Sequence, residues 1–131
     1  MFLLDTNICI YISKNPSPTL RKHFAAASQV GVAMSVVTYF ELCFGASKSD
    51  RTEMVMKKLE EFRELVPVLP LTSDAGEAYG FIRNDLKRRG VLIGPHDMLI
   101  AAHALSLGAT LVTNNISEFH RVRGLKLENW A

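Results

Sequence analysis

Three carboxylates stand where a chain normally places apolar side chains. They are Asp5 in FLLDTNICI, Glu41 in VVTYFELCFG and Asp97 in IGPHDMLIAAHAL. None has another Asp, Glu, Lys or Arg within six positions, whereas every other acid of the chain has one within three. A buried carboxylate without a partner is costly, so something must compensate these charges. A shared cation would do so, and oxygen ligands without thiolates favour the hard ions Mg²⁺ or Mn²⁺.

Each acid also has a separate structural explanation. Asp5 could cap a helix, and Asp97 could lie in the first turn of one, where the helix dipole favours an acid by under ~1 kcal/mol. Glu41 could pair with a distant basic residue, but no basic residue lies one helical turn away from it. We therefore predict that the three acids converge on a metal ion. We expect His96 and His103 to be solvated or core-edge side chains rather than ligands.

Alternating strands and helices must position these acids. The expected strands cover residues 2–4, 31–37, 67–71, 109–113 and 125–127. The expected helices cover residues 6–14, 18–28, 39–46 with Thr38 as N-cap, 51–65 with Asp50 as N-cap, 73–90 and 95–107. This alternation predicts a single α/β domain over 1–131, with a parallel sheet flanked by helices on both faces. Ligands bind beyond the carboxyl ends of such strands, where Asp5, Thr38, Asn114 and Asn115 fall.

Composition narrows the possible functions. The chain has 131 residues, of which 48% are hydrophobic, so it can bury a core. Two cysteines are too few for a disulfide scaffold or a thiolate zinc site. The start of the chain lacks the basic residues of a signal peptide, and no apolar run suits a bilayer span. We expect a cytoplasmic protein that makes no membrane contact, with both thiols reduced.

Charge points to a phosphodiester substrate. The net charge is only +2, so no strong basic field surrounds the whole chain. Without the three isolated acids, however, 15 basic residues would face ten acidic ones. An acidic pocket in a mildly basic surface suits RNA or DNA. The basic residues that could hold phosphates are Arg83, Lys87, Arg88, Arg89, Arg121, Arg123 and Lys126.

Four sequence blocks resemble one known family. The blocks LDTNICIYI, SVVTYFELCFGA, IGPHDMLIAAHAL and LVTNNISEFHRVRGLKLENW look like those of VapC-type toxins, the PIN-domain ribonucleases of VapBC toxin–antitoxin pairs. The resemblance implies a PIN-like three-layer α/β/α sandwich around a mostly parallel sheet of four to five strands. It also implies a Mg²⁺-dependent endoribonuclease that hydrolyses phosphodiester bonds of structured RNA, such as a tRNA anticodon loop. Its products would carry a 5′-phosphate and a 3′-hydroxyl.

The same resemblance assigns roles to residues. Asp5, Glu41 and Asp97 match the family's metal-binding acids. Asn115 stands where many PIN domains have a fourth acid, which leaves a second metal ion open, although an amide oxygen can still bind an ion or hold a water. Glu118 lies close by and could contribute, or it could be an exposed charge near a basic residue.

Further expectations concern supporting residues and partners. The polar residues expected to orient the carboxylates are Thr6, Asn7, Ser35, Thr38 and Asn114. A cognate VapB-type antitoxin is expected to insert an Arg into the acidic pocket, because Arg binds carboxylates bidentately. We also expect a homodimer, and the apolar residues of the helix over 51–65 offer surface for a second copy or a partner.

Two other functions remain possible from the residues alone. A signalling receiver domain is also α/β with an acidic Mg²⁺ pocket. It needs an acid pair after the first strand and a Lys after the fifth strand, and this chain has neither. A non-catalytic PIN module that only binds RNA or a partner is the other. The three retained acids argue against it, and Asn115 in place of a fourth acid keeps it open. Dependence of cleavage on Asp97 separates that alternative from the nuclease.

Overall fold

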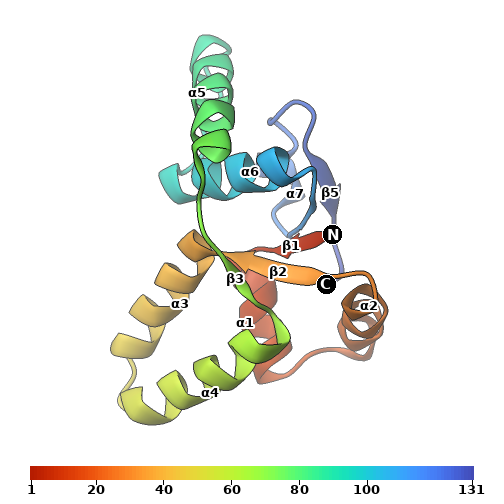
Figure 1. Cartoon of the computed structure of the whole chain (residues 1–131), viewed down its shortest axis with the longest axis vertical. Helices are drawn as coiled ribbons and strands as arrows, with labels where there is room; N and C mark the ends of the chain where they lie inside the picture. Colours follow the sequence, from red (N-terminus) through yellow and green to blue (C-terminus); the bar gives the residue numbers. More distant parts are fainter.

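The chain folds around a five-stranded sheet in which every pair of neighbouring strands is parallel, with the order β3-β2-β1-β4-β5. The computed structural model describes all residues, 1–131. Figure 1 shows helices covering both faces of this sheet. The strands are β1 (Phe2–Leu4), β2 (Val32–Ser35), β3 (Val68–Leu69), β4 (Thr110–Val112) and β5 (Lys126–Glu128). The helices are α1 (Thr6–Lys14), α2 (Pro18–Ser28), α3 (Val36–Ser47), α4 (Thr52–Leu65), α5 (Ser73–Arg88), α6 (Pro95–Leu107) and α7 (Ile116–Phe119).

Alternation along the central strand β1 separates two cores. Leu3 points to one face of the sheet and joins a cluster with residues of α5 and α6, including Ile82 and Ile100. Leu4 points to the other face and joins a second cluster with residues of α1, α2 and α4, among them Ile8. In Figure 1 the first group of helices lies above the sheet and the second below it. The expected α/β/α sandwich with a parallel sheet is therefore confirmed.

The central position of β1 aligns the strand ends that matter for the site. Leu4 pairs with Met34 of β2 and with Val112 of β4. The residue that follows each strand therefore emerges at the same edge. Asp5 remains attached to that edge, because its backbone N–H donates to the Val112 carbonyl at 3.0 Å.

Several expected boundaries are wrong. The second strand ends at Ser35 and not at residue 37, because the Ser35 hydroxyl accepts the backbone N–H of Val37 and starts α3 there. Thr38 therefore lies inside α3 and is not its N-cap. Asp50 does not cap α4 either, since Arg51 occupies the N-cap position and makes no side-chain capping bond.

The remaining differences lie toward the edges of the sheet. The third strand is reduced to Val68–Leu69, and the fifth is shifted by one residue to Lys126–Glu128. The short helix α7 was not expected, because four residues are too few to show a helical period. No helix of the chain combines the length and the apolar character that crossing a bilayer requires.

Trp130 should be a major contributor to stability although it is the second-last residue. Its side chain is 2% exposed, lies edge-on to Phe2 with ring centroids 5.5 Å apart, and stacks on His23 at 5.9 Å. We expect Trp130→Ala to lower the free energy of unfolding by about 3–5 kcal/mol in denaturant titration. Val30→Ala, at a side chain 68% exposed, should change it by less than about 0.5 kcal/mol. A similar small effect of both substitutions would contradict this packing.

Candidate active site

Asp5 is a buried carboxylate at the end of the central strand. It caps α1, since its Oδ1 accepts the backbone N–H of Ile8 at 2.9 Å. The Thr113 hydroxyl, at the end of β4, also bonds to this carboxylate. Burial nevertheless raises the pKa of Asp5 above its ordinary value, despite the lowering effect of these two hydrogen bonds. The capping role is therefore real, but it does not compensate the charge.

Glu41 reaches the same edge from the second turn of α3. Its Oε1 accepts a hydrogen bond from the Thr6 hydroxyl at 2.6 Å, and the Thr38 hydroxyl lies 3.4 Å from that of Thr6. Its Oε2 lies 3.5 Å from Nδ1 of His96. No Lys or Arg forms an ion pair with Glu41, so the distant basic partner considered from the sequence does not exist.

Asp97 carries the clearest electrostatic sign of convergence. Burial raises its pKa to about 6, with further contributions from the negative charges of Glu118, Glu41 and Asp5, in that order. His96 opposes the shift. Glu118, Glu41 and Asp5 therefore all lie close enough to Asp97 for their charges to raise its pKa, which groups the predicted acids around Asp97 and adds Glu118 to them.

The fourth acid comes from one turn beyond the expected position. Asn115 precedes α7, and its side-chain amide donates to Oε2 of Glu118. The backbone N–H of Asn115 donates to the Thr113 hydroxyl at 2.9 Å. Asn115 thus positions Glu118, whose charge acts on Asp97. Of the two sequence interpretations of Glu118, the contribution to the site is the one that the geometry favours.

The other expected supporting residues divide into two groups. Thr6 and Thr38 lie at Glu41 as described, whereas Asn7 is exposed and its side chain makes no hydrogen bond. Asn114 is exposed too and donates to the Tyr11 hydroxyl at 3.2 Å, away from any carboxylate.

Ser35 binds a histidine instead of a carboxylate. Its hydroxyl lies 2.8 Å from Nδ1 of His103 on α6, and both side chains are buried. Burial lowers the pKa of His103, so the ring is neutral. His103 is therefore a core residue, as expected, and with Ser35 it connects the start of α3 to the middle of α6.

Two contributors to the site were not expected from the sequence. Thr113 was not among the expected site residues, and His96 was expected to be a solvated or core-edge side chain. Thr113 binds the carboxylate of Asp5 and the backbone of Asn115 at once. The available signal was its position: a hydroxyl directly after the strand that pairs with β1, opposite Asp5. The His96 ring is the only basic side chain within ion-pair distance of Glu41, and its position directly before Asp97 was the signal for it.

The donor chemistry of this cluster fits a hard divalent ion. All four acids offer oxygen, neither free cysteine joins them, and no Lys or Arg pairs with any of them. No three Asp, Glu, His or Cys side chains are arranged to hold one ion directly. Mg²⁺ needs no such arrangement, because it keeps several waters and binds proteins through one or two carboxylates. The residues therefore suit Mg²⁺ better than a tightly caged metal such as Zn²⁺.

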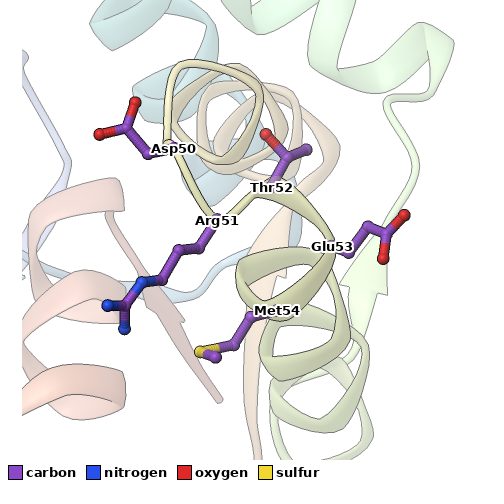
Figure 2. Close-up of a pocket in the computed structure, with 5 residues that line it drawn as sticks. All are labelled: Asp50, Arg51, Thr52, Glu53 and Met54. Atoms are coloured by element: carbon purple, nitrogen blue, oxygen red, sulfur yellow. The ribbon is translucent and has the colours of Figure 1, made fainter.

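One shallow hollow of the surface lies away from the acids. It is formed at the turn between α3 and α4 by consecutive residues from Asp50 to Met54. Figure 2 shows that these side chains point in different directions and do not converge. This hollow therefore carries no arrangement of groups comparable to the acids.

The comparisons with known proteins agree with this fold and cluster. Residues 2–125 match the family model described as PIN domain. The chain is 40% identical over 131 residues to Ribonuclease VapC2 of Rickettsia felis, covering 99% of this chain and 98% of the relative. It is 42% identical over 130 residues to the tRNA(fMet)-specific endonuclease VapC of Shigella flexneri, with the same coverage.

A solved structure is similar over the same extent. The VapBC2 complex of Rickettsia felis bound to a promoter DNA fragment contains a chain that matches with a TM-score of 0.94 and 36% identity, covering 99% of this chain and 98% of that one. The fold and its acidic edge thus define a PIN-domain nuclease. The chain belongs to the VapC ribonucleases, the toxins of VapBC toxin–antitoxin systems.

Repulsion among the acids should be measurable as pH-dependent stability. The pKa of Asp97 in the folded protein, about 6, exceeds the unfolded value of 3.8, so its favourable contribution is complete below pH 4 and is lost as the pH rises through 6. In EDTA at pH 7.5, Asp97→Asn should therefore raise the free energy of unfolding by about 1 kcal/mol, allowing for screening of a half-exposed group. The gain should shrink toward pH 4.

The matched control is Asp74→Asn. Asp74 is likewise an Asp in the first turn of a helix, α5, but it is exposed and outside the acidic cluster. Its substitution should give no gain that grows between pH 4 and 7.5. Equal behaviour of the two variants would contradict the repulsion.

Proposed function

We propose that this chain is a Mg²⁺-dependent endoribonuclease that cuts structured RNA, with a tRNA anticodon loop as the favoured target. The observation that carries the proposal is the cluster of four carboxylates at the carboxyl edge of the sheet, with which no Lys or Arg forms an ion pair. The name of the Shigella flexneri relative, a tRNA(fMet)-specific endonuclease, supports tRNA as the substrate. RNA of this kind is found in the cytoplasm, which is where we place the protein.

Asp5 and Asp97 would hold the ion, and Glu41 and Glu118 would contribute directly or through water. Such an ion supplies a Lewis acid that activates water and stabilises negative charge on the phosphate. Around it, the Thr6 hydroxyl fixes the Glu41 carboxylate, as Thr113 fixes that of Asp5.

The reaction is hydrolysis of one phosphodiester bond. A water oxygen bonds to phosphorus, the bond from phosphorus to the 3′-oxygen breaks, and that oxygen takes up a proton. The products are a 3′-hydroxyl and a 5′-phosphate. A carboxylate of the cluster that does not bind the ion directly would accept the proton that the water gives up.

Cleavage should depend on the acids and on the metal. Purified, antitoxin-free protein should cut total bacterial RNA to a discrete fragment in Mg²⁺, and EDTA should abolish the cut. Asp5→Asn and Asp97→Asn should each lower the rate by at least about 10²-fold, because each removes charge that the ion requires. Asp74→Asn should cleave like the unmodified chain. Unchanged cleavage by a folded, Mg²⁺-saturated Asp97→Asn variant would overturn the assignment.

A cognate VapB-type antitoxin would use the same cluster. No Lys or Arg of the chain pairs with the acids, and an Arg donated by a bound segment would bind a carboxylate bidentately. Glu41 is flanked on α3 by Phe40 and Phe44, which are 67% and 63% exposed. An antitoxin segment that carries an Arg close to apolar side chains would fit an acid that has exposed aromatic rings beside it. The toxin copies would pair as a homodimer in this assembly.

Removal of the two aromatic rings should loosen the antitoxin. Phe40→Ser with Phe44→Ser should raise the antitoxin concentration needed for half-inhibition by at least about tenfold, since each exposed aromatic anchor contributes about 1 kcal/mol or more. Inhibition is measured against each variant's own uninhibited rate. Phe81→Ser, at an exposed phenylalanine of α5, is the control. An unchanged inhibition curve would show that the antitoxin binds elsewhere.

A further inference from the structure

We infer that the arginines joining the end of α5 to the segment after α7 form a second binding site, for the phosphate backbone of the RNA that the acids cut. This arginine cluster consists of Arg88, Arg89, Arg121 and Arg123. The inference depends on the proposed function only in taking RNA as the ligand. Its residues and contacts are separate from those of the acidic cluster.

Asp85 organises the arginine cluster. Its Oδ2 accepts hydrogen bonds from Nη2 and Nε of Arg89, at 2.6 and 3.1 Å, and lies 3.8 Å from Nε of Arg123. The hydrogen bonds from Arg89 are the largest cause that lowers the pKa of Asp85, and the charges of Arg123 and Arg88 act in the same direction. One carboxylate thus contacts two guanidinium groups and feels the charge of a third.

Backbone carbonyls complete this network. Nη2 of Arg89 also donates to the carbonyl of Arg121 at 2.5 Å, and Nη1 of Arg121 donates to the carbonyl of Leu92 at 3.2 Å. Two segments 32 residues apart in the sequence are therefore joined by their arginines. These bonds hold the cationic side chains together against their mutual repulsion.

The network leaves an excess of positive charge. The cluster has four guanidinium groups and one carboxylate, which pairs with Arg89 and Arg123, and no other acid forms an ion pair with any of the four. The dipole of α5 favours basic residues in its last turn, which accounts for Arg88 but not for Arg121 and Arg123. All four arginines are exposed. Exposed guanidinium groups held close together are typical of sites that bind phosphate.

Short stretches of chain connect the arginine cluster to the acids. Leu92, which accepts from Arg121, begins the short connection to Asp97, and Arg121 follows Glu118 by three residues. RNA strands carry a phosphate at every nucleotide, so a strand bound at the acids offers further phosphates along its length to the arginines. Contacts to such phosphates fix the position of a substrate without reading its bases.

Binding can be tested without cleavage in the Asp97→Asn background. We choose Arg88→Gln with Arg123→Gln, because these two make no hydrogen bond to a backbone carbonyl that the fold depends on. The probe is a fluorescein-labelled tRNA anticodon stem-loop, titrated by anisotropy at several salt concentrations. The charge-matched control is Arg21→Gln with Lys22→Gln, two exposed residues of α2. Thermal melting verifies that both double variants fold.

We expect the Arg88/Arg123 variant to bind about five- to tenfold more weakly than the control at low salt. The slope of log affinity against log salt should fall by about 1.5, as for two lost phosphate contacts. In the chain that retains Asp97 and cleaves RNA, the Arg88→Gln and Arg123→Gln substitutions together should raise KM and leave kcat nearly unchanged.

Equal binding by the two double variants would overturn the inference, and so would a loss of affinity for a DNA duplex of the same length but not for the RNA. The proposed function is judged separately, by whether the unmodified chain cuts RNA in Mg²⁺. If the protein does not cut RNA but shows the expected difference in binding, the RNA-binding role of the arginine cluster is supported and the proposed nuclease function is wrong.

Discussion

Repulsion between carboxylates is the main electrostatic constraint on the structure of this protein. Four acids from four different segments meet at one edge of a parallel sheet, and no Lys or Arg pairs with them. Charges in such a position cost free energy, and that cost has to be met by the rest of the fold. This unfavourable arrangement is useful for binding. Because the carboxylates repel one another, a cation that binds among them lowers the free energy of the site.

The scaffold resists this repulsion with neutral hydrogen bonds. The backbone N–H of Ile8 and the Thr113 hydroxyl hold Asp5, and the Thr6 hydroxyl holds Glu41. The buried contact between Ser35 and His103 joins α3 to α6, the helices that carry Glu41 and Asp97. Nε2 of His103 has no hydrogen-bond partner, so this contact is itself maintained at some cost. Neutral donors fix the carboxylates in place and leave their charge available.

Much of this could be predicted from the sequence, because isolated acids and alternating elements are local signals. Asp5, Glu41 and Asp97 stand out by their apolar neighbours, and the order of strands and helices follows from periodicity. What could not be predicted depends on contacts across the chain. The partner of Ser35 lies 68 residues away, and Thr113 owes its role to the pairing of β4 with β1.

Short elements account for the other failures. One hydroxyl decides where β2 ends, since Ser35 caps α3 three residues before the expected cap. The helix α7 turns Glu118 toward Asp97, and four residues leave no periodic pattern from which that orientation can be predicted. The acid missing at Asn115 is thus replaced by one a single helical turn later.

The place of Trp130 in the core has a consequence for folding. The strand β1 packs through Phe2 against the Trp130 ring, so two residues 128 positions apart in the sequence are in contact. A contact across so long a stretch of chain forms late, because the entropy of closing the loop is lost before the contact can stabilise it. The packing of Trp130 on β1 is therefore expected among the last contacts of the core to form.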